Sequence, residues 1–250
     1  MKISIIGSGV AVPSLRRSSP GLVIEAGDEE MLFDCGPDIL RGLLKSEIAH
    51  QEIDRIFITH FHPDHTLGLA HFLFASRYEI RPRINDLWIA GPPGLDEFIK
   101  KFKKVYPEWL EAKEYHLFIH IISGNGWSGP GWRIRTAPVS HNPESIAYRL
   151  EENGGGSLVY SGDTGYCRSL IELARGADLL IAECSFPDTV DVPGHLGPRK
   201  AGRIAREASV KQLLLTHMYP PCDSLDVVGQ CRKEFGGEVI RAEDGMVIEL

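Results

Sequence analysis

The stretch His60-Phe61-His62-Pro63-Asp64-His65 decides both the fold class and the expected site of this chain. Four side chains that can bind a metal fall within these six residues, directly after the apolar run Arg55–Thr59 and before a helical pattern over His65–Ser76. At a strand-to-helix turn, the first two histidines can point the same way, while the aspartate and the last histidine can reach a second point nearby. Two neighbouring metal ions are therefore geometrically reasonable.

Further ligands must come from other segments, because a catalytic zinc ion takes about three protein ligands plus water and this stretch cannot complete two such sites. His141, Asp163 and His217 each lie just past the C-terminal end of an apolar run, as do Asp34 and Glu183. The ends of strands on one side of a sheet are where open α/β folds place ligand crevices. The sequence therefore predicts one metal site assembled from segments that are far apart along the chain.

Apolar runs of β-type composition alternate with helical patterns along the whole chain, which indicates a layered α/β fold with helices covering sheet faces. With 250 residues and 43% hydrophobic content, the chain is expected to form one domain over residues 1–250. The predicted strands are Lys2–Ile6, Gly21–Ala26, Met31–Phe33, Arg55–Thr59, Leu87–Ala90, His116–Ile122, Trp132–Pro138, Ile146–Leu150, Leu158–Tyr160, Leu179–Ala182, Gln212–Leu215, Glu238–Ile240 and Met246–Leu250. The predicted helices are Asp38–Lys45, His65–Ser76, Gly94–Val105, Cys167–Arg175, Pro198–Ala208 and Leu225–Glu234.

Charge and cysteine content narrow the class of protein. The net charge of −7 argues against broad nonspecific binding of nucleic acid, which needs clustered lysine and arginine. The five cysteines are odd in number and include no C-x-x-C pair, so neither a disulfide framework nor a cysteine zinc site is indicated. No run approaches the roughly 18 apolar residues of a membrane span, and the apolar run after Lys2 stops at Gly7, too early for a signal peptide. We therefore expect a cytoplasmic protein that is not embedded in a membrane.

The motif H-x-H-x-D-H, followed by separate His, Asp and His residues, resembles the metallo-β-lactamase fold superfamily. The resemblance extends over nearly the whole chain, from Asp34 to His217. Within the superfamily, the opening Ile6–Pro13 and the segments Ala182–Phe186 and Gly194–Leu196 resemble ribonuclease Z-like proteins. The resemblance implies an αββα four-layer sandwich and a hydrolase that uses two zinc ions, with manganese or iron as alternatives.

The resemblance also implies a role for each site residue. Glu183 and His195 resemble a pair that protonates the leaving oxygen, a role that histidine can fill near pH 7; the alternative is an ordinary strand-end carboxylate and a loop histidine. The reaction implied is attack of a metal-bound hydroxide on phosphorus. The expected set places one metal on His60, His62 and His141, the other on Asp64, His65 and His217, Asp163 between them, Asp34 as an orienting residue, and Asp64, Glu183 and His195 as the catalytic residues.

Two departures from the ribonuclease Z pattern concern the substrate. Ribonucleases Z that process transfer RNA usually carry a long arm between the third and fourth motifs, but His141 and Asp163 are only 22 positions apart. The usual Ser-Thr after the motif histidine is replaced by Leu196-Gly197. Together with the acidic charge, these departures favour a small phosphodiester or nucleotide-like substrate over RNA, which stays possible.

Two other functions fit the same motifs. One is hydrolysis of a carbonyl substrate, such as a thioester, a lactone or a β-lactam. The other is a noncatalytic nucleic-acid-binding or scaffold protein on this fold, which the complete ligand set disfavours. A homodimer is implied by the resemblance alone.

Overall fold

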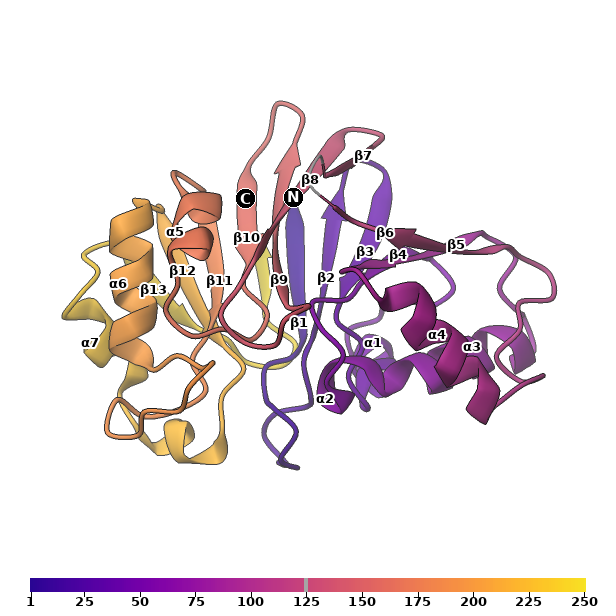
Figure 1. The fold of residues 1–250 in the computed structure, drawn as a ribbon, viewed down its shortest axis with the longest axis horizontal. Helices are drawn as coiled ribbons and strands as arrows, with labels where there is room; N and C mark the ends of the chain where they lie inside the picture. The colour runs from indigo at the N-terminus through magenta and orange to yellow at the C-terminus, as the bar shows by residue number, and fades with distance from the viewer. Residues whose placement is uncertain (124–125) are drawn as a thin grey trace.

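Two seven-stranded mixed sheets lie face to face at the centre of the computed structural model, which describes residues 1–123 and 126–250 (Figure 1). The first sheet has the order β14 (Val247–Glu249), β1 (Lys2–Gly7), β2 (Gly21–Ala26), β3 (Glu29–Phe33), β4 (Ile53–Phe57), β5 (Leu87–Gly91) and β6 (Leu117–Ile121). The second has the order β13 (Glu238–Arg241), β12 (Gln212–Thr216), β11 (Leu179–Glu183), β10 (Ser157–Tyr160), β9 (Ile146–Glu152), β8 (Trp132–Pro138) and β7 (Trp127–Gly129).

Helices cover the outer face of each sheet, so the layers run helix, sheet, sheet, helix (Figure 1). Three buried apolar clusters separate these layers, one between the sheets and one under each group of helices. The expected αββα sandwich is therefore confirmed. The first sheet is covered by α1 (Ile39–Lys45), α2 (Pro63–Thr66), α3 (Gly68–Tyr78) and α4 (Leu95–Val105), and the second by α5 (Arg168–Ala174), α6 (Pro198–Ala208) and α7 (Val227–Arg232), with the 3-10 turn η1 (Pro220–Ser224) before α7.

Strand direction brings the site residues to one edge of the sandwich. Strands β3 to β6 are mutually parallel in the first sheet, and β10 to β13 are mutually parallel in the second. Strand β8 runs the same way as β10, because both are antiparallel to the β9 that lies between them. The polar residues that follow these strands therefore meet at the carboxyl edges of both sheets.

The helix expected over residues 65–76 is interrupted, and this is the main difference from the sequence-based prediction. Helix α2 ends at Thr66 and α3 begins at Gly68. The N–H of Gly68 donates to the Cys35 carbonyl, 2.9 Å away, so it leaves the helical ladder. A Cβ at Gly68 would lie 2.1 Å from the Gly36 carbonyl oxygen, so only glycine permits this close approach.

Other differences are smaller. Strand β4 ends at Phe57 rather than Thr59, and the short strand β7 was not expected because three residues give no periodicity. Between His141 and Asp163 the structure confirms a simple hairpin of β9 and β10.

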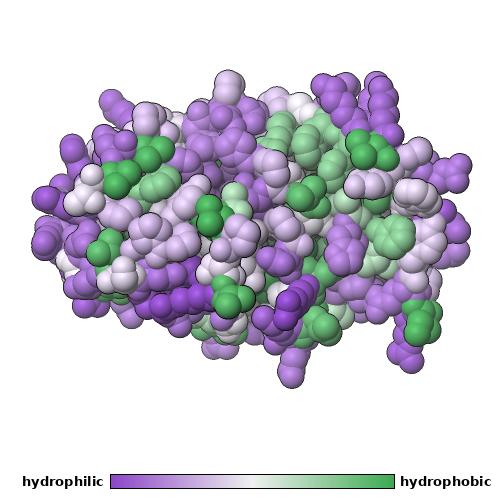
Figure 2. All heavy atoms as spheres, turned by 90° about the horizontal axis from the view of Figure 1, so that it is seen from below, coloured by the Kyte–Doolittle hydropathy of each residue, from purple (hydrophilic) through white to green (hydrophobic). Residues whose placement is uncertain are grey.

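The face seen from below in Figure 2, on the side where α2 lies, is largely hydrophilic, with single hydrophobic residues scattered over it. A broader hydrophobic area lies on the right, in the half that carries α3 and α4. Scattered apolar residues of this kind are normal on a protein surface. Within residues 1–123 and 126–250, no helix has the length and apolar character needed to cross a membrane.

Candidate metal centre

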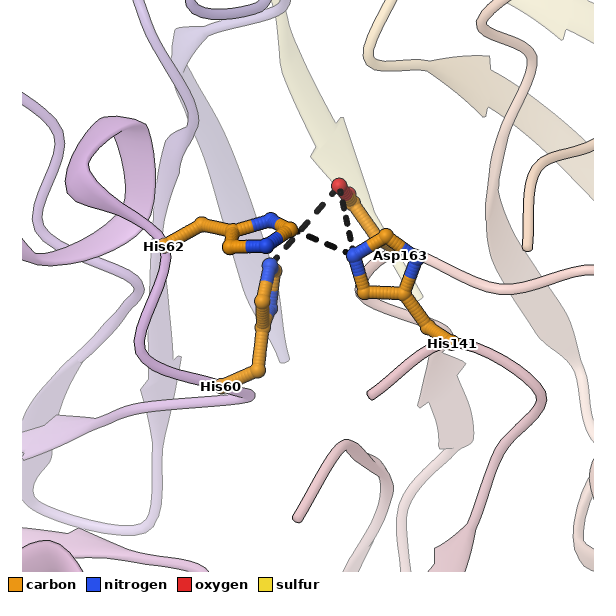
Figure 3. A group of neighbouring side chains, drawn as sticks. All are labelled: His60, His62, His141 and Asp163. Carbon is orange, nitrogen blue, oxygen red and sulfur yellow. Dashed lines mark hydrogen bonds and ion pairs between the residues drawn. The ribbon is translucent and has the colours of Figure 1, made fainter. Parts of the chain in front are cut away.

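Four of the expected ligands converge at the edge where the two sheets meet. His60 and His62 come from the turn between β4 and α2, while His141 and Asp163 follow β8 and β10 and approach from the opposite side (Figure 3). Asp163 Oδ2 lies 3.8 Å from Nε2 of both His60 and His141. Nε2 of His141 lies 3.2 Å from Nδ1 of His62. These four side chains thus enclose one point with nitrogen and oxygen donors.

A second group lies on the other side of Asp163. The Nε2 atoms of His65 and His217 are 3.2 Å apart, and each is 3.2 Å from Asp163 Oδ1. Asp64 Oδ2 lies 3.8 Å from His65 Nε2 and 3.6 Å from His217 Nε2. Each carboxylate oxygen of Asp163 therefore faces a different group, which is the arrangement that a bridging ligand requires.

Each histidine in the two groups has its other ring nitrogen held by the protein. Such contacts fix the ring orientation and leave one nitrogen free to bind a metal. The pairs are His60 Nδ1 with the Thr59 hydroxyl, His62 Nε2 with the Asn142 amide and His141 Nδ1 with the Gly194 carbonyl, each at 3.0 Å, His65 Nδ1 with Asp34 at 2.8 Å, and His217 Nδ1 with the Ser185 hydroxyl at 3.0 Å.

Asp34 is fully buried beneath the centre and accepts several hydrogen bonds. Its donors are the Thr59 N–H at 2.8 Å, the Thr59 hydroxyl, His65 Nδ1–H at 2.8 Å and the Tyr160 hydroxyl at 2.9 Å. Asp34 has a φ of 58° and His217 a φ of 55°, a left-handed conformation that non-glycine residues seldom adopt. Backbone strain of this kind gathers at functional sites, and here it marks the points where two strands deliver site residues.

The donor atoms fit divalent metal ions. A tetrahedral zinc ion with bonds near 2.1 Å needs ligand atoms about 3.4 Å apart. The pairs of atoms given above are 3.2 to 3.8 Å apart, and the ligand atoms of each group all lie within 4.8 Å of one another. His60 Nε2 and Asp163 Oδ1 are buried and lack a hydrogen-bond partner, which would be costly unless a cation satisfied both atoms.

Electrostatics agree with this fit. Burial, with His65 nearby, lowers the pKa of His60, which keeps its imidazole neutral as a ligand must be. Burial alone would raise the pKa of Asp163, but His217 and His65 outweigh burial and hold that pKa well below its usual value. His60 is therefore held neutral beside an ionised Asp163. Burial would also lower the pKa of His65, but the carboxylates of Asp163 and Asp34 outweigh burial and raise that pKa well above its usual value, so a metal ion bound here would displace a proton from His65.

Glu183 and His195 lie beside the second group. His195 Nδ1–H donates to Glu183 Oε1 at 2.9 Å, and His195 offers a further donor atom close to Asp163 and His217. Burial lowers the pKa of His195, but the hydrogen bond to Glu183 and the charges of Glu183, Asp163 and Asp64 together outweigh burial and raise that pKa. Glu183 is itself buried and also accepts from the N–H groups of Thr164 and Leu196. This arrangement fixes the ring of His195 beside the centre.

Asp34 was expected to orient a ligand, but the other side chains that hold the histidine rings were missed by sequence reasoning. Thr59 and Asn142 each adjoin a ligand in sequence, and Ser185 follows Glu183 by two positions. The Ser185 hydroxyl donates to Glu183 and accepts from His217, so it links the expected acid pair to a metal ligand. The only signal in the sequence was the adjacency of small polar residues to the motifs.

The chain is similar to a known protein family and to several solved structures. The family model "Beta-lactamase superfamily domain" matches residues 29–218. A ribonuclease Z from Methanothermobacter thermautotrophicus is 28% identical over 302 residues, covering 100% of this chain and 97% of that protein. The metallo-β-lactamase fold protein YhfI from Bacillus subtilis has a TM-score of 0.85 at 28% identity, covering 100% of this chain and 99% of that chain. The short form of human tRNase Z has a TM-score of 0.79 at 26% identity, covering 100% and 99%.

The family match extends over most of the chain and over every expected ligand, so the chain belongs to the beta-lactamase superfamily and has the metallo-β-lactamase fold. Within that superfamily it is a ribonuclease Z-like protein, and a metal-dependent hydrolase. The expected family, fold class and enzyme class are thereby confirmed.

Proposed function

We propose that this chain is a dinuclear, zinc-dependent phosphodiesterase, and that residues 1–250 act as one domain. The observation that carries the proposal is the position of Asp163, which is 3% exposed and turns one oxygen to each histidine group. A carboxylate placed in this way suits two ions a few ångströms apart. Imidazole and carboxylate donors together suit zinc, with manganese or iron as alternatives.

The proposed ligand sets follow the two groups of side chains. His60, His62 and His141 would hold one ion, Asp64, His65 and His217 would hold the other, and Asp163 would contact both. Metal ions bound here would neutralise the phosphodiester anion and lower the pKa of water toward neutrality. The protein supplies the positions of the ligands, because Asp34, Thr59, Asn142 and Ser185 fix the histidine rings.

The proton that the leaving oxygen needs would come from His195. Its Nδ1 is engaged with Glu183, so Nε2 is the nitrogen free to give up a proton toward the centre. The buried Glu183 carboxylate stabilises the protonated imidazole and holds the ring in place. A general acid of this kind serves a reaction in which an alkoxide leaves, as it does in phosphodiester hydrolysis.

The relatives support a phosphodiester rather than a carbonyl substrate. The M. thermautotrophicus relative is a ribonuclease Z, and the human neighbour is a tRNase Z. The alignment with the archaeal protein runs over 302 residues, so that relative carries segments that this 250-residue chain lacks. A short hairpin is all that separates His141 from Asp163. These observations favour a small phosphodiester over transfer RNA as the substrate.

The test combines metal analysis with a panel of substrates. The purified chain is expected to hold two metal ions and to hydrolyse bis(p-nitrophenyl) phosphate, with little turnover of a thioester, a lactone or a β-lactam. The Asp163→Ala variant should lose at least one ion and, on the scale of removing a key transition-state contact, activity by a factor of about 100 or more. Asp178→Ala, far from the centre on β11's N-terminal side, is the matched control. Less than one metal per chain, full activity in Asp163→Ala, or turnover of a carbonyl substrate alone would contradict the proposal.

A further inference from the structure

A cavity of about 130 Å³ is lined in part by His195 and by none of the seven proposed metal ligands. Its walls come from the loop between β11 and α6 and from the first turn of α6. Phe186 forms one wall, Val190 and Val192 form part of another, and Lys200 lies at the start of the helix. The cavity thus lies beside the residue that is expected to protonate the leaving oxygen.

Phe186 is held rigidly in this wall. Its ring stacks on Tyr219, with centroids 4.5 Å apart and planes 21° apart, and packs edge-on against His195 at 5.5 Å. Its N–H donates to the Leu196 carbonyl, and the N–H of Tyr219 donates to the Ser185 carbonyl. A ring fixed by both backbone and side-chain contacts offers a flat apolar surface that needs little ordering when a ligand binds.

The size and charge of the cavity restrict what it can hold. An engineered protein cavity of about 150 Å³ accommodates one benzene molecule, so 130 Å³ open to solvent suits a single six-membered ring. Lys200 Nζ lies 2.6 Å from Asp191 Oδ1, so the one lysine of the cavity is already paired. The acidic Asp188 also lines it. A second phosphate would meet these acidic groups, whereas an uncharged ring would not.

We propose that this cavity is the subsite for a single planar ring, an aryl group or a pyrimidine base, carried by the alcohol that leaves the phosphodiester. The proposal rests on the proposed function, because a proton from His195 reaches only an oxygen that lies beside it. The group attached to that oxygen must then lie next to His195, and this cavity is a space that His195 lines. Phe186 supplies the stacking surface.

Binding of three phosphodiesters to the zinc-loaded chain tests this subsite without turnover. The probes are diphenyl, methyl phenyl and dimethyl phosphate, measured by titration calorimetry. The two phenyl esters should bind about fivefold or more tightly than dimethyl phosphate, as expected for one stacked ring. They should bind nearly alike, because the cavity holds one ring.

Three variants distinguish loss of the ring subsite from a general loss of phosphodiester binding. Phe186→Leu keeps an apolar side chain but should remove the preference for a ring while leaving dimethyl phosphate affinity unchanged. Val190→Trp, at an exposed loop position, should remove the same preference by filling the cavity. Phe98→Leu is the control, since Phe98 stacks on Phe61 at 4.8 Å and does not line this cavity.

Equal affinity of the wild-type chain for methyl phenyl and dimethyl phosphate would overturn the subsite. So would an undiminished ring preference in both Phe186→Leu and Val190→Trp. Turnover of bis(p-nitrophenyl) phosphate is measured separately, so a phosphodiesterase without a ring preference refutes the subsite alone. A zinc-loaded chain that neither binds nor hydrolyses any phosphodiester refutes the proposed function as well.

Discussion

The buried carboxylate of Asp34 offers the sharpest test of how the protein orients a ligand without touching the metal. In Asp34→Asn, the retained oxygen can still accept from the Thr59 N–H at 2.8 Å. The new amide group then replaces Oδ2, which accepts from His65 Nδ1–H at 2.8 Å and from the Tyr160 hydroxyl at 2.9 Å. Asparagine tolerates the φ of 58° at this position, so backbone strain is not added.

The magnitude follows from these partners. The Tyr160 hydroxyl can rotate to accept from the amide. His65 is fully buried and can accept from the amide only in the tautomer that carries its proton on Nε2, and a metal ion on Nε2 would exclude that tautomer. A buried Nδ1–H of His65 that is left without an acceptor costs about 1–3 kcal/mol, so the free energy of unfolding should fall by up to about that amount. Loss of a carboxylate that orients a metal-binding histidine typically weakens metal affinity by about 10- to 100-fold. Both changes are expected, and the affinity change should be confined to the ion held by His65.

The assay is a chelator competition for zinc together with urea unfolding of the apo chain. Asp178→Asn is the matched control, because Asp178 also accepts hydrogen bonds, from the N–H and hydroxyl of Ser157, at the other end of β10. It should lose stability and keep zinc affinity. Zinc affinity in Asp34→Asn that equals the wild-type value would refute the orienting role. An equal loss of zinc affinity in Asp34→Asn and Asp178→Asn would show a general effect of reduced stability.

Three further predictions follow from the same structure. Lys211 and the hydrogen bonds from Ser157 hold the pKa of Asp178 at about 2. The ionised carboxylate therefore contributes its full stability above the unfolded pKa of about 3.9, and this contribution is lost as the pH falls toward 2. The difference in free energy of unfolding between wild type and Asp178→Asn, measured in urea, should shrink over that pH range. His195→Ala should slow hydrolysis of a diester with an alkyl leaving group by about 100-fold or more. The variant should slow release of p-nitrophenolate far less, because this leaving group needs no proton. An equal loss of rate with both substrates would exclude a general acid. Asn142→Ala should weaken binding of the ion on His62 by about tenfold in chelator competition without shifting the unfolding midpoint of the apo chain, and unchanged affinity would exclude its orienting role.

Much of the fold was predictable because its elements carry strong local signals. Buried strands such as β11 are short continuous apolar runs, and α6 has both a proline in its first turn and a clear apolar face. The predictions from sequence fail where tertiary contacts determine where a helix or strand ends. Residues 65–76 look like one helix, yet the chain turns at Leu67 because the N–H of Gly68 bonds to Cys35. No local pattern reveals a hydrogen bond to a residue some thirty positions earlier.

The candidate ligands were predictable for a different reason, since residue types suited to metals follow strand ends and parallel strands bring those ends together. What the sequence could not show is which nitrogen of each histidine faces the centre. His62 turns Nδ1 inward, whereas His60, His65, His141 and His217 turn Nε2 inward.

That choice is set by partners on other segments, such as Asn142 for His62 and Ser185 for His217. Ser185 also donates to Glu183, so one hydroxyl connects the orientation of a metal-binding histidine to the carboxylate that holds His195. A change at Ser185 should therefore disturb both metal binding and proton donation, whereas a change at Asn142 should disturb metal binding alone. The two halves of the site are then coupled through the second sheet, which carries Glu183 at the end of β11 and His217 just past β12.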